Sequence, residues 1–397
     1  MPDSVAPESS HEEIPLLLTR RAPRRSPSVR GFSLHPTPQM GIVINKRFRV
    51  EGYLGEGGTA TVYLARDATN KRLVVIKRMK PDVAKIPELR QRFLMEARAL
   101  AAVDHPAVVR VLDIHEPEDE PPFLTLAALR GESLGDFLKR ETVMSTELTI
   151  QLMRQAVHAL EAVHCAGIVH RDIKPDNLFL VGPVGEPQSI KVLDFGMARL
   201  ADEGHDEEST SILGTVQYMA PEQILVEPVD PRTDVYALGV VMFRMLTGHL
   251  PFDDDSKTAL LRHQLFSPVP PVDWLADDLP DALERIVHKA TRKSPCSRFQ
   301  TMSDFSRALD GLVGVEAPPS SRRASTVIPS AEPDIYRPVS KRGRHVASVL
   351  ATEFGVYSRP HYPADSSTFQ SAPNPALISS ADESVAPLEL EPMASNR

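Results

Sequence analysis

The spacing of apolar residues changes once along the central part of this chain, and the change divides that part in two. Apolar and polar residues alternate in five short runs, which predict antiparallel strands at 47–54, 59–66, 72–77, 108–116 and 122–129. The apolar residues then recur at helical spacing, which predicts helices at 87–103, 146–164, 234–246, 280–291 and 302–312. We therefore predict an α+β fold in which a small strand-rich lobe with one main helix precedes a larger helical lobe, with a cleft between them.

The two ends of the chain differ from this central part in composition. Half of the 36 prolines lie in residues 1–46 and 315–397. The first 46 residues carry R-R-A-P-R-R-S-P and almost no apolar periodicity, so we expect a disordered arm there. We also expect a largely disordered Pro/Ser-rich tail at 314–397, with one short ordered patch at 346–357. The folded domain is then 47–313, divided near residues 129 and 130.

Charge and cysteine content exclude several classes of protein. The chain has 45 Lys and Arg against 53 Asp and Glu, a net charge of −8, which argues against nucleic-acid binding. Its two cysteines are too few for a disulfide framework or a four-ligand zinc site. The longest uncharged apolar run, 235–243, is far short of a membrane span, and the first residues are acidic rather than basic. We therefore expect a cytoplasmic protein without a membrane span.

A glycine-rich loop lies between the first two predicted strands. The run L-G-E-G-G-T-A-T-V-Y at 54–63 places Gly55, Gly57 and Gly58 where backbone amides could approach a polyphosphate. Because a strand rather than a helix follows, the loop does not resemble a dinucleotide-binding fingerprint. Taken alone, it could equally be a glycine-rich hairpin without a ligand.

Two charged residues of the small lobe are candidates for the same site. Lys77 ends the apolar run L-V-V-I-K, and Glu96 lies beside the apolar face of the helix at 87–103. A carboxylate in that position requires a cation, so we expect an inward Lys77–Glu96 ion pair that orients the amine on nucleotide phosphates. The alternatives are a surface lysine and a solvated glutamate.

The run H-R-D-I-K-P-D-N at 170–177 follows a long predicted helix and precedes the apolar run 178–181. Together with D-F-G at 194–196 and A-P-E at 220–222, it resembles the signature set of eukaryotic-like protein kinases. The segments G-E-G-G-T-A-T-V-Y and G-T-V-Q-Y-M-A-P-E-Q most resemble those of bacterial Ser/Thr kinases. The resemblance covers about 265 residues and implies the bilobal protein kinase fold with ATP and Mg²⁺ or Mn²⁺ as cofactors.

The resemblance also implies roles that suit the chemistry of phosphoryl transfer. Asp172 would accept the proton of the acceptor hydroxyl, and Lys174 would neutralise negative charge on the phosphoryl group during transfer. Asn177 and Asp194 are oxygen ligands of the type that Mg²⁺ prefers. The adenine is expected among apolar side chains, and backbone groups of Ala127 to Leu129 would read its edge. The apolar residues expected there are Leu54, Val62, Val75, Leu126 and Phe179. His170, Phe195, Leu100 and Asp234 match positions that stack or anchor the two lobes.

Further features of the resemblance concern the acceptor and its control. Lys174 and the pair Gly214-Thr215 resemble Ser/Thr rather than Tyr kinases, and Glu222 is expected to pair with Arg298. A phosphate in the serine-rich run 206–211 could bind Arg171 and order the loop. The candidate phosphorylation sites are Ser209, Thr210 and Ser211. A further candidate, the basophilic string R-R-A-S, lies at 322–325.

Departures from the family pattern leave the charged residues in place. Ala60 replaces the third loop glycine, Val75 replaces the usual alanine, Ala127 replaces a frequent glutamate, and the insertion 182–189 lengthens one hairpin. A pseudokinase scaffold and a small-molecule phosphotransferase stay open as alternatives. The expected partners are protein substrates, with a second copy contacting the small lobe and a protein on the C-terminal tail as further possibilities.

Overall fold

The computed structural model describes residues 40–195, 216–254, 256–274, 279–312 and 340. These residues belong to one unit, residues 1–360, while a second unit, 361–397, lies wholly outside the described residues. The expected patch at 346–357 and the phosphorylation candidates Ser209, Thr210 and Ser211 also lie outside them.

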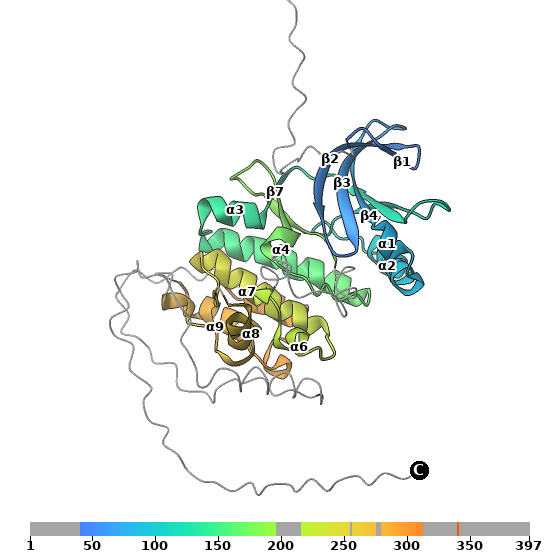
Figure 1. Cartoon of the computed structure of the whole chain (residues 1–397). Helices are drawn as coiled ribbons and strands as arrows, with labels where there is room; N and C mark the ends of the chain where they lie inside the picture. The colour runs from blue at the N-terminus through green and yellow to red at the C-terminus, as the bar shows by residue number, and fades with distance from the viewer. Residues whose placement is uncertain (1–39, 196–215, 255, 275–278, 313–339, 341–397) are drawn as a thin grey trace, which may run out of the picture. The chain divides into compact units, whose positions relative to one another are not determined.

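The N-terminal lobe is an antiparallel sheet of six strands in the order β1-β2-β3-β4-β6-β5 (Figure 1). The five strands expected from alternation are present, and they are β2 (Phe48–Glu56), β3 (Ala60–Asp67), β4 (Leu73–Met79), β5 (Val111–His115) and β6 (Phe123–Ala127). A sixth strand, β1 (Val43–Ile44), was not expected, because two residues are too few to show an alternating pattern. It extends the sheet by pairing with the start of β2.

One main helix, α2 (Pro87–Ala101), accompanies this sheet, as the sequence predicts, and a short helix, α1 (Pro81–Ala84), precedes it. Pro87 occupies the first turn of α2, where a missing N–H costs nothing. The buried face of α2 consists of Phe93, Leu94, Ala97 and Leu100. Because these residues recur at helical spacing, α2 packs one face toward the interior and leaves the other exposed.

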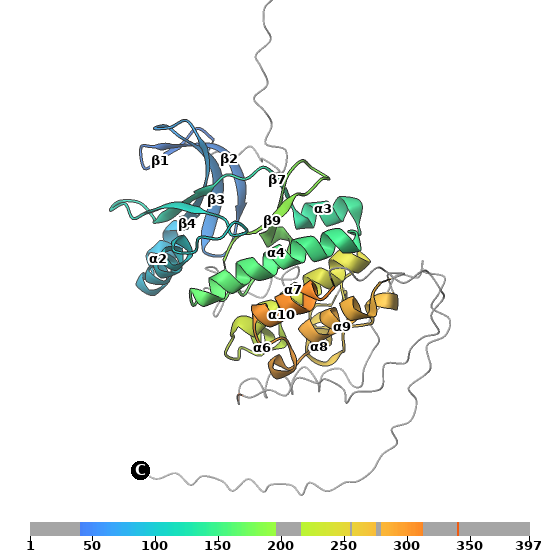
Figure 2. The same ribbon diagram turned by 180° about the vertical axis from the view of Figure 1, so that it is seen from behind.

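The C-terminal lobe is mainly helical (Figure 1). Its longer helices are α3 (Leu134–Glu141), α4 (Thr146–Cys165), α7 (Pro231–Thr247), α8 (Lys257–Phe266), α9 (Asp281–Ala290) and α10 (Met302–Asp310), with the short helix α6 (Pro221–Ile224). Helix α10 packs against α4, and α7 contacts both α4 and α9 (Figure 2). Nearly every residue of α7 is buried, so this helix forms the centre of the lobe.

A small antiparallel sheet of β7 (Gly131–Ser133), β8 (Leu178–Val181) and β9 (Ser189–Val192) lies where the lobes meet. The insertion forms the connection between β8 and β9, as the sequence predicts. Backbone hydrogen bonds tie β9 to the chain just after α2, from Val109 N to Val192 O at 3.1 Å and from Val192 N to Ala107 O at 2.8 Å. The end of α2 is thereby fixed to the C-terminal lobe.

The main hydrophobic core runs through both lobes, from Phe93 and Leu124 to Leu160 and Phe243. A second cluster, which includes Phe48, Ile76 and Phe123, covers the other face of the large sheet. The α+β fold in two lobes is therefore confirmed. Within the described residues, no helix is long and apolar enough to cross a membrane.

Candidate active site

Lys77 and Asp194 form an ion pair that joins the two lobes. Lys77 lies in β4, opposite Val62 of β3 and Leu124 of β6, and is only 7% exposed. Its Nζ donates to Oδ1 of Asp194 at 3.0 Å. The charge of the Lys77 ammonium holds the pKa of Asp194 below its usual value, against the opposing effect of burial. Two residues 117 positions apart in the sequence therefore meet, from two of the segments that carry predicted site residues.

The expected ion pair between Lys77 and Glu96 is absent, which corrects the sequence analysis. Among the described residues, the Glu96 carboxylate has no hydrogen-bond or ion-pair partner within 4 Å. Burial raises the pKa of Glu96, and the charges of Arg171, then Arg92 and then Lys77 oppose that rise. The ammonium of Lys77 is instead directed to Asp194, so helical spacing placed Glu96 correctly but could not identify its partner.

The loop at 170–177 gathers three of the predicted residues within hydrogen-bonding distance. The Nδ2 of Asn177 donates to the backbone oxygen of Asp172 at 2.7 Å and to its Oδ2 at 2.9 Å. The Nζ of Lys174 lies 3.0 Å from the same Oδ2. The side chain of Asp172 is thus fixed from two sides while remaining partly exposed.

Asp234, near the start of α7, fixes this loop through hydrogen bonds to its backbone. Its Oδ2 accepts from the backbone N–H of His170 at 2.8 Å and lies 2.7 Å from Nε2 of His164, while its Oδ1 accepts from the N–H of Arg171 at 2.8 Å. Arg171 has a φ of 66°, a value that an L-residue adopts only when its surroundings enforce it. The buried Asp234 carboxylate compensates for that strain.

His170 connects the loop to the segment that carries Asp194. Its Nε2 lies 2.7 Å from the backbone oxygen of Leu193, and its Nδ1 accepts from the N–H of Asp172 at 3.3 Å. The ring also packs on Phe195, with the two ring centroids 4.8 Å apart. The positions of Asp172 and Asp194 are therefore coupled through one side chain.

The glycine-rich turn joins β2 and β3 as expected, with Gly57 N donating to Ala60 O at 2.8 Å. A Cβ atom added at Gly55 or Gly57 would meet no atom within 4 Å. The space around Gly57 therefore does not require glycine, whereas Gly55 has a φ of 156°, a backbone conformation that favours glycine even without close neighbours. The open space at Gly57 is therefore what favours a loop with room for a ligand, while Gly55 also serves the turn.

The residues expected around an adenine lie on neighbouring strands. Cross-strand pairing places Gly55 opposite Val62 and Val75 opposite Leu126. Leu54, Val62, Val75, Ala127 and Leu129 are partly exposed, Leu126 is 7% exposed and Phe179, in β8, is buried. The N–H of Ala127 donates to Arg110 O at 3.0 Å, so reading an adenine edge falls to other backbone groups of 127–129.

Glu222 and Arg298 form the buried pair that the sequence predicts. Arg298 donates from Nη1 and Nη2 to the two carboxylate oxygens of Glu222, at 2.7 and 2.9 Å. Thr233 Oγ1 donates to the same carboxylate at 2.8 Å. This pair fixes α6 to the helical lobe.

Sequence reasoning missed Gln223, the residue after Glu222. Its Nε2 donates to the backbone oxygen of Arg171 at 2.8 Å, and its Oε1 accepts from Ala220 N at 3.1 Å. Gln223 therefore links α6 directly to the loop that carries Asp172. The residues are 52 positions apart in the sequence, and nothing in the local pattern indicates the contact.

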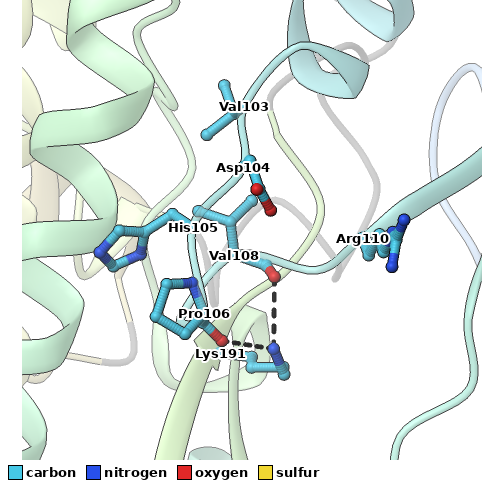
Figure 3. A pocket seen from close by; sticks show the side chains of 7 residues that line it. All are labelled: Val103, Asp104, His105, Pro106, Val108, Arg110 and Lys191. Carbon is cyan, nitrogen blue, oxygen red and sulfur yellow. Dashed lines mark hydrogen bonds between the residues drawn. The ribbon is translucent and has the colours of Figure 1, made fainter.

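A cavity of about 260 Å³ lies away from these residues, at the turn after α2 (Figure 3). It is lined by Val103, Asp104, His105, Pro106, Val108, Arg110 and Lys191. The Nζ of Lys191 donates to the backbone oxygens of Pro106 and Val108, and burial lowers the pKa of Lys191. Because its lining includes none of the predicted site residues, this cavity is not the nucleotide site.

Comparison with known proteins agrees with the fold and the site. The family model described as the protein kinase domain matches residues 48–305. The kinase domain of Mycobacterium tuberculosis PknI, a solved structure, has a TM-score of 0.53 and 22% sequence identity, covering 70% of this chain and all of that domain. This likeness shows the fold alone. The chain belongs to the protein kinase family.

Bacterial serine/threonine kinases are among its curated relatives. Serine/threonine-protein kinase Pkn1 of Myxococcus xanthus is 36% identical over 321 residues, which are 77% of this chain and 46% of Pkn1. PknB of Mycolicibacterium smegmatis is 38% identical over 275 residues, 68% of this chain and 43% of PknB. PknA of Mycobacterium tuberculosis is 32% identical over 305 residues, 74% of this chain and 69% of PknA.

Within the family, these relatives place the chain among the bacterial, eukaryotic-like serine/threonine kinases, as the motifs predict. The chain spans about half the length of several of the curated relatives it matches.

Proposed function

We propose that this chain is a protein serine/threonine kinase that transfers the γ-phosphoryl group of ATP to Ser or Thr hydroxyls of proteins. The observation that supports this most directly is the ion pair between Lys77 and Asp194 beside the fixed trio of Asp172, Lys174 and Asn177. Phosphoryl transfer needs chiefly alignment and neutralisation of charge, and these five side chains provide both.

Asp172 acts as the base in this proposal. Its carboxylate accepts the proton of the acceptor hydroxyl, whose oxygen forms a bond to the γ-phosphorus as the bond from that phosphorus to the bridging oxygen breaks and ADP leaves. Lys174, 3.0 Å from the same carboxylate, neutralises charge on the transferred group. The hydrogen bond from Asn177 keeps the carboxylate aimed during the step.

The chemistry of the donors fits a magnesium ion. Asp194 offers a partly exposed carboxylate, and the hydrogen bonds of Asn177 use its Nδ2, which leaves the amide oxygen for a cation. The described residues contain no cluster of three or more His, Cys, Asp or Glu that could hold a metal by themselves. Mg²⁺ suits such a site, because it retains water and phosphate oxygens as ligands. When bound, it neutralises charge on the phosphates.

The nucleotide is proposed to bind under the glycine-rich loop. Gly55, Gly57 and Gly58 let the turn approach the phosphates, since an added Cβ atom at Gly55 or Gly57 would meet only open space, and Lys77 holds the α- and β-phosphates. Glu96 orients Lys77 during turnover, which requires a rearrangement from the Lys77–Asp194 pair described here. The adenine rests among the apolar residues of β2, β3, β4 and β6, with Phe179 beneath it.

Regulation and partners extend the same proposal. Autophosphorylation of Ser209, Thr210 or Ser211 would supply a phosphate for Arg171. The protein partners are its substrates, while a second copy on the N-terminal lobe and a protein bound to the C-terminal tail remain predictions. A pseudokinase is expected to lack Lys77, Asp172, Asn177 or Asp194, and all four are present. A small-molecule phosphotransferase generally lacks the A-P-E element, which is present at 220–222.

The purified chain should be incubated with Mg²⁺ and labelled ATP, and its own phosphorylation sites and that of an added protein followed by mass spectrometry. We expect phosphoserine or phosphothreonine in the wild type and at least a hundredfold slower transfer in Asp172→Asn. Asp119→Asn, the same chemical change at an exposed position of the N-terminal lobe, is the matched control and should retain full activity. Equal rates in Asp172→Asn and wild type would refute the proposal, as would label on small molecules alone.

A further inference from the structure

One residue of the C-terminal tail contacts the helical lobe. The backbone N–H of Ser340 donates to Oε1 of Glu227 at 2.8 Å, and the two residues are 113 positions apart in the sequence. Glu227 is only 6% exposed, and Ser340 is partly exposed. Leu312, far ahead of Ser340 in the sequence, still belongs to the main hydrophobic core. The tail therefore contacts the helical lobe at a point well beyond the residues that form its core.

Glu227 lies in the turn that connects α6 to α7, and its side chain is buried. Its own N–H donates to the backbone oxygen of Glu222 at 2.8 Å. The preceding residue, Val226, has a φ of 54° and is 47% exposed. A β-branched residue adopts this conformation only where its surroundings enforce it. The turn thus exposes an apolar side chain and buries a carboxylate, which is the reverse of the usual preference.

The hydrogen bond from Ser340 serves this buried carboxylate. A carboxylate in the interior is stable only where hydrogen-bond donors surround it. The N–H of Ser340 is such a donor, and it comes from outside the residues that form the helical lobe. A buried carboxylate that loses a donor keeps the cost of desolvation without the bond that compensated for it. The conformation of the turn and the position of Ser340 therefore depend on each other.

The composition of the tail around Ser340 suits the surface of the turn. Glu227 is flanked by Val226 and Pro228, both of them exposed. The sequence at 338–344 is P-V-S-K-R-G-R, in which an apolar pair precedes Ser340 and three basic residues follow it. Apolar groups favour contact with Val226 and Pro228, and positive charge favours approach to a carboxylate. The two surfaces are therefore complementary in charge and in hydrophobicity.

The tail is long enough to reach this turn within one chain. A segment as long as that between Leu312 and Ser340 would span roughly 30 Å even without being extended, which is about the width of a small domain. Because both partners belong to one chain, the turn meets the tail at an effective concentration that is roughly millimolar. A contact made by few groups is therefore enough to hold the tail on the lobe.

We propose that the turn at 226–228 is a docking site for the C-terminal tail of the same chain, which binds there at Ser340. The Glu227 carboxylate is the acceptor that fixes the tail, and the exposed apolar residues beside it complete the surface. A protein that recognises this part of the tail must then displace it from the lobe. The docking site uses none of the residues assigned to phosphoryl transfer, so the inference holds independently of the proposed kinase function.

Limited digestion of the full chain with trypsin, followed by mass spectrometry, measures this docking. Trypsin can cleave after Arg342, close to Ser340, and after Arg323, elsewhere in the tail. Glu227→Ala removes the acceptor, and Ser340→Pro removes the N–H donor at a position outside the folded lobe. Because cleavage follows the population of undocked tail, we expect both variants to be cut at least about fivefold faster after Arg342. The rate after Arg323 should stay within about twofold of wild type.

Two matched controls accompany these variants. Ser340→Ala keeps the backbone N–H, and Glu186→Ala removes an exposed glutamate from the connection between β8 and β9, so both should be cut as the wild type is. Urea unfolding shows whether Glu227→Ala has lost its fold, in which case Ser340→Pro decides alone. Equal cleavage of Ser340→Pro and wild type after Arg342 would overturn the proposal. Cleavage of the wild type that slows as the chain concentration is raised would place the tail on a second copy, which also contradicts docking within one chain.

Discussion

At the scale of single residues, two carboxylates compete for the ammonium of Lys77. Asp194 holds it at 3.0 Å and gains a lowered pKa from its charge. Glu96 lies half-buried with a raised pKa, because its surroundings oppose the charged form. Folding therefore favours the Lys77–Asp194 pair and leaves Glu96 with an electrostatic cost that only a closer cation would offset.

The substitution Glu96→Gln separates stability from activity. The amide of glutamine is nearly isosteric with the carboxylate and carries no charge. It therefore avoids the cost of burying a charge, which is what raises the pKa of Glu96. We expect a melting temperature equal to or above that of wild type at pH 7, and at least tenfold lower kcat/KM for ATP. Differential scanning calorimetry and initial rates measure the two effects. Glu88→Gln, at an exposed position of the same helix, should change neither, and a destabilised but fully active Glu96→Gln protein would contradict this account.

The buried pair of Glu222 and Arg298 allows a second prediction at this scale. Arg298→Met leaves the Glu222 carboxylate, 3% exposed, without its two charge-assisted hydrogen bonds. We expect a loss of about 3–5 kcal/mol in the free energy of unfolding, measured by urea titration. The double variant Arg298→Met with Glu222→Gln should recover part of that loss. Additive losses in the double variant would show that the two side chains are not coupled.

The contacts of some of these residues could be predicted from the sequence and those of others could not, for a physical reason. Glu222, Arg298 and Asp234 belong to motifs, and their buried charges require partners, so their contacts could be expected. Gln223 and Gln264 are neutral, and they bond to backbone oxygens 52 and 47 residues away. No local pattern encodes such a contact, because it exists only after the helices have packed.

At the scale of secondary structure, prediction succeeded where one face of an element is buried. Strands β2 to β4 alternate and helices α2 and α10 are amphipathic, so their residues were located from periodicity alone. Strands β1 and β7, of two and three residues, are too short to show a period. Helix α7 is buried nearly all round, and the sequence predicted it at 234–246, three residues short of its start.

Close packing of α7 on α9 makes Gly239 a position where two opposing effects can be weighed. A Cβ atom there would lie 2.7 Å from Ala290 Cβ and 2.9 Å from Thr291 Cγ2. Alanine gains about 1 kcal/mol of helix propensity, whereas overpacking typically costs about 1–3 kcal/mol. We expect Gly239→Ala to be destabilised in urea unfolding, because the helices must separate.

The control for Gly239→Ala is Gly311→Ala, where the added Cβ would lie at an ordinary 3.5 Å from Ala308 O. That variant should be as stable as wild type or slightly more so. Combining Gly239→Ala with Ala290→Gly removes the nearest contact and should restore part of the lost stability. A Gly239→Ala protein more stable than wild type would show that propensity outweighs packing at this crossing.

At the scale of the whole described structure, side-chain contacts join the two lobes. Lys77 and Asp194 connect β4 to the segment after β9, and His170 connects that segment to the catalytic loop. The functional prediction depends on four residues from three separate segments of the sequence, which are Lys77, Asp172, Asn177 and Asp194. Lys77 contacts Asp194, and Asn177 contacts Asp172. The sequence could not predict which carboxylate, that of Glu96 or that of Asp194, the ammonium of Lys77 contacts.

Stability should fall in two stages as the pH is lowered. Burial lowers the pKa of His105, His115 and His263, so the unfolded chain binds these protons first, and stability begins to fall below about pH 6.5. Arg140 chiefly lowers the pKa of Glu132, and Lys77 that of Asp194. When the pH is above the ordinary pKa of a carboxyl group, these two carboxylates stabilise the folded chain. That contribution is lost as the pH falls below about 4. Calorimetry from pH 7 to pH 3 measures both stages.

The first stage can be assigned to a residue by comparing slopes rather than absolute melting temperatures. His263 faces Arg262, Asp254 and Lys293 and lies beside Ser267 and the ring of Phe252, so burial among mostly cationic neighbours disfavours its protonated form. In His263→Gln the fall in melting temperature between pH 6.5 and pH 5 should be shallower, whereas His249→Gln, at an exposed position, should keep the wild-type slope. If the melting temperature of His263→Gln fell more steeply with pH than that of wild type, folding would favour the protonated imidazole. That result would contradict the buried position of His263 on α8, close to Lys293.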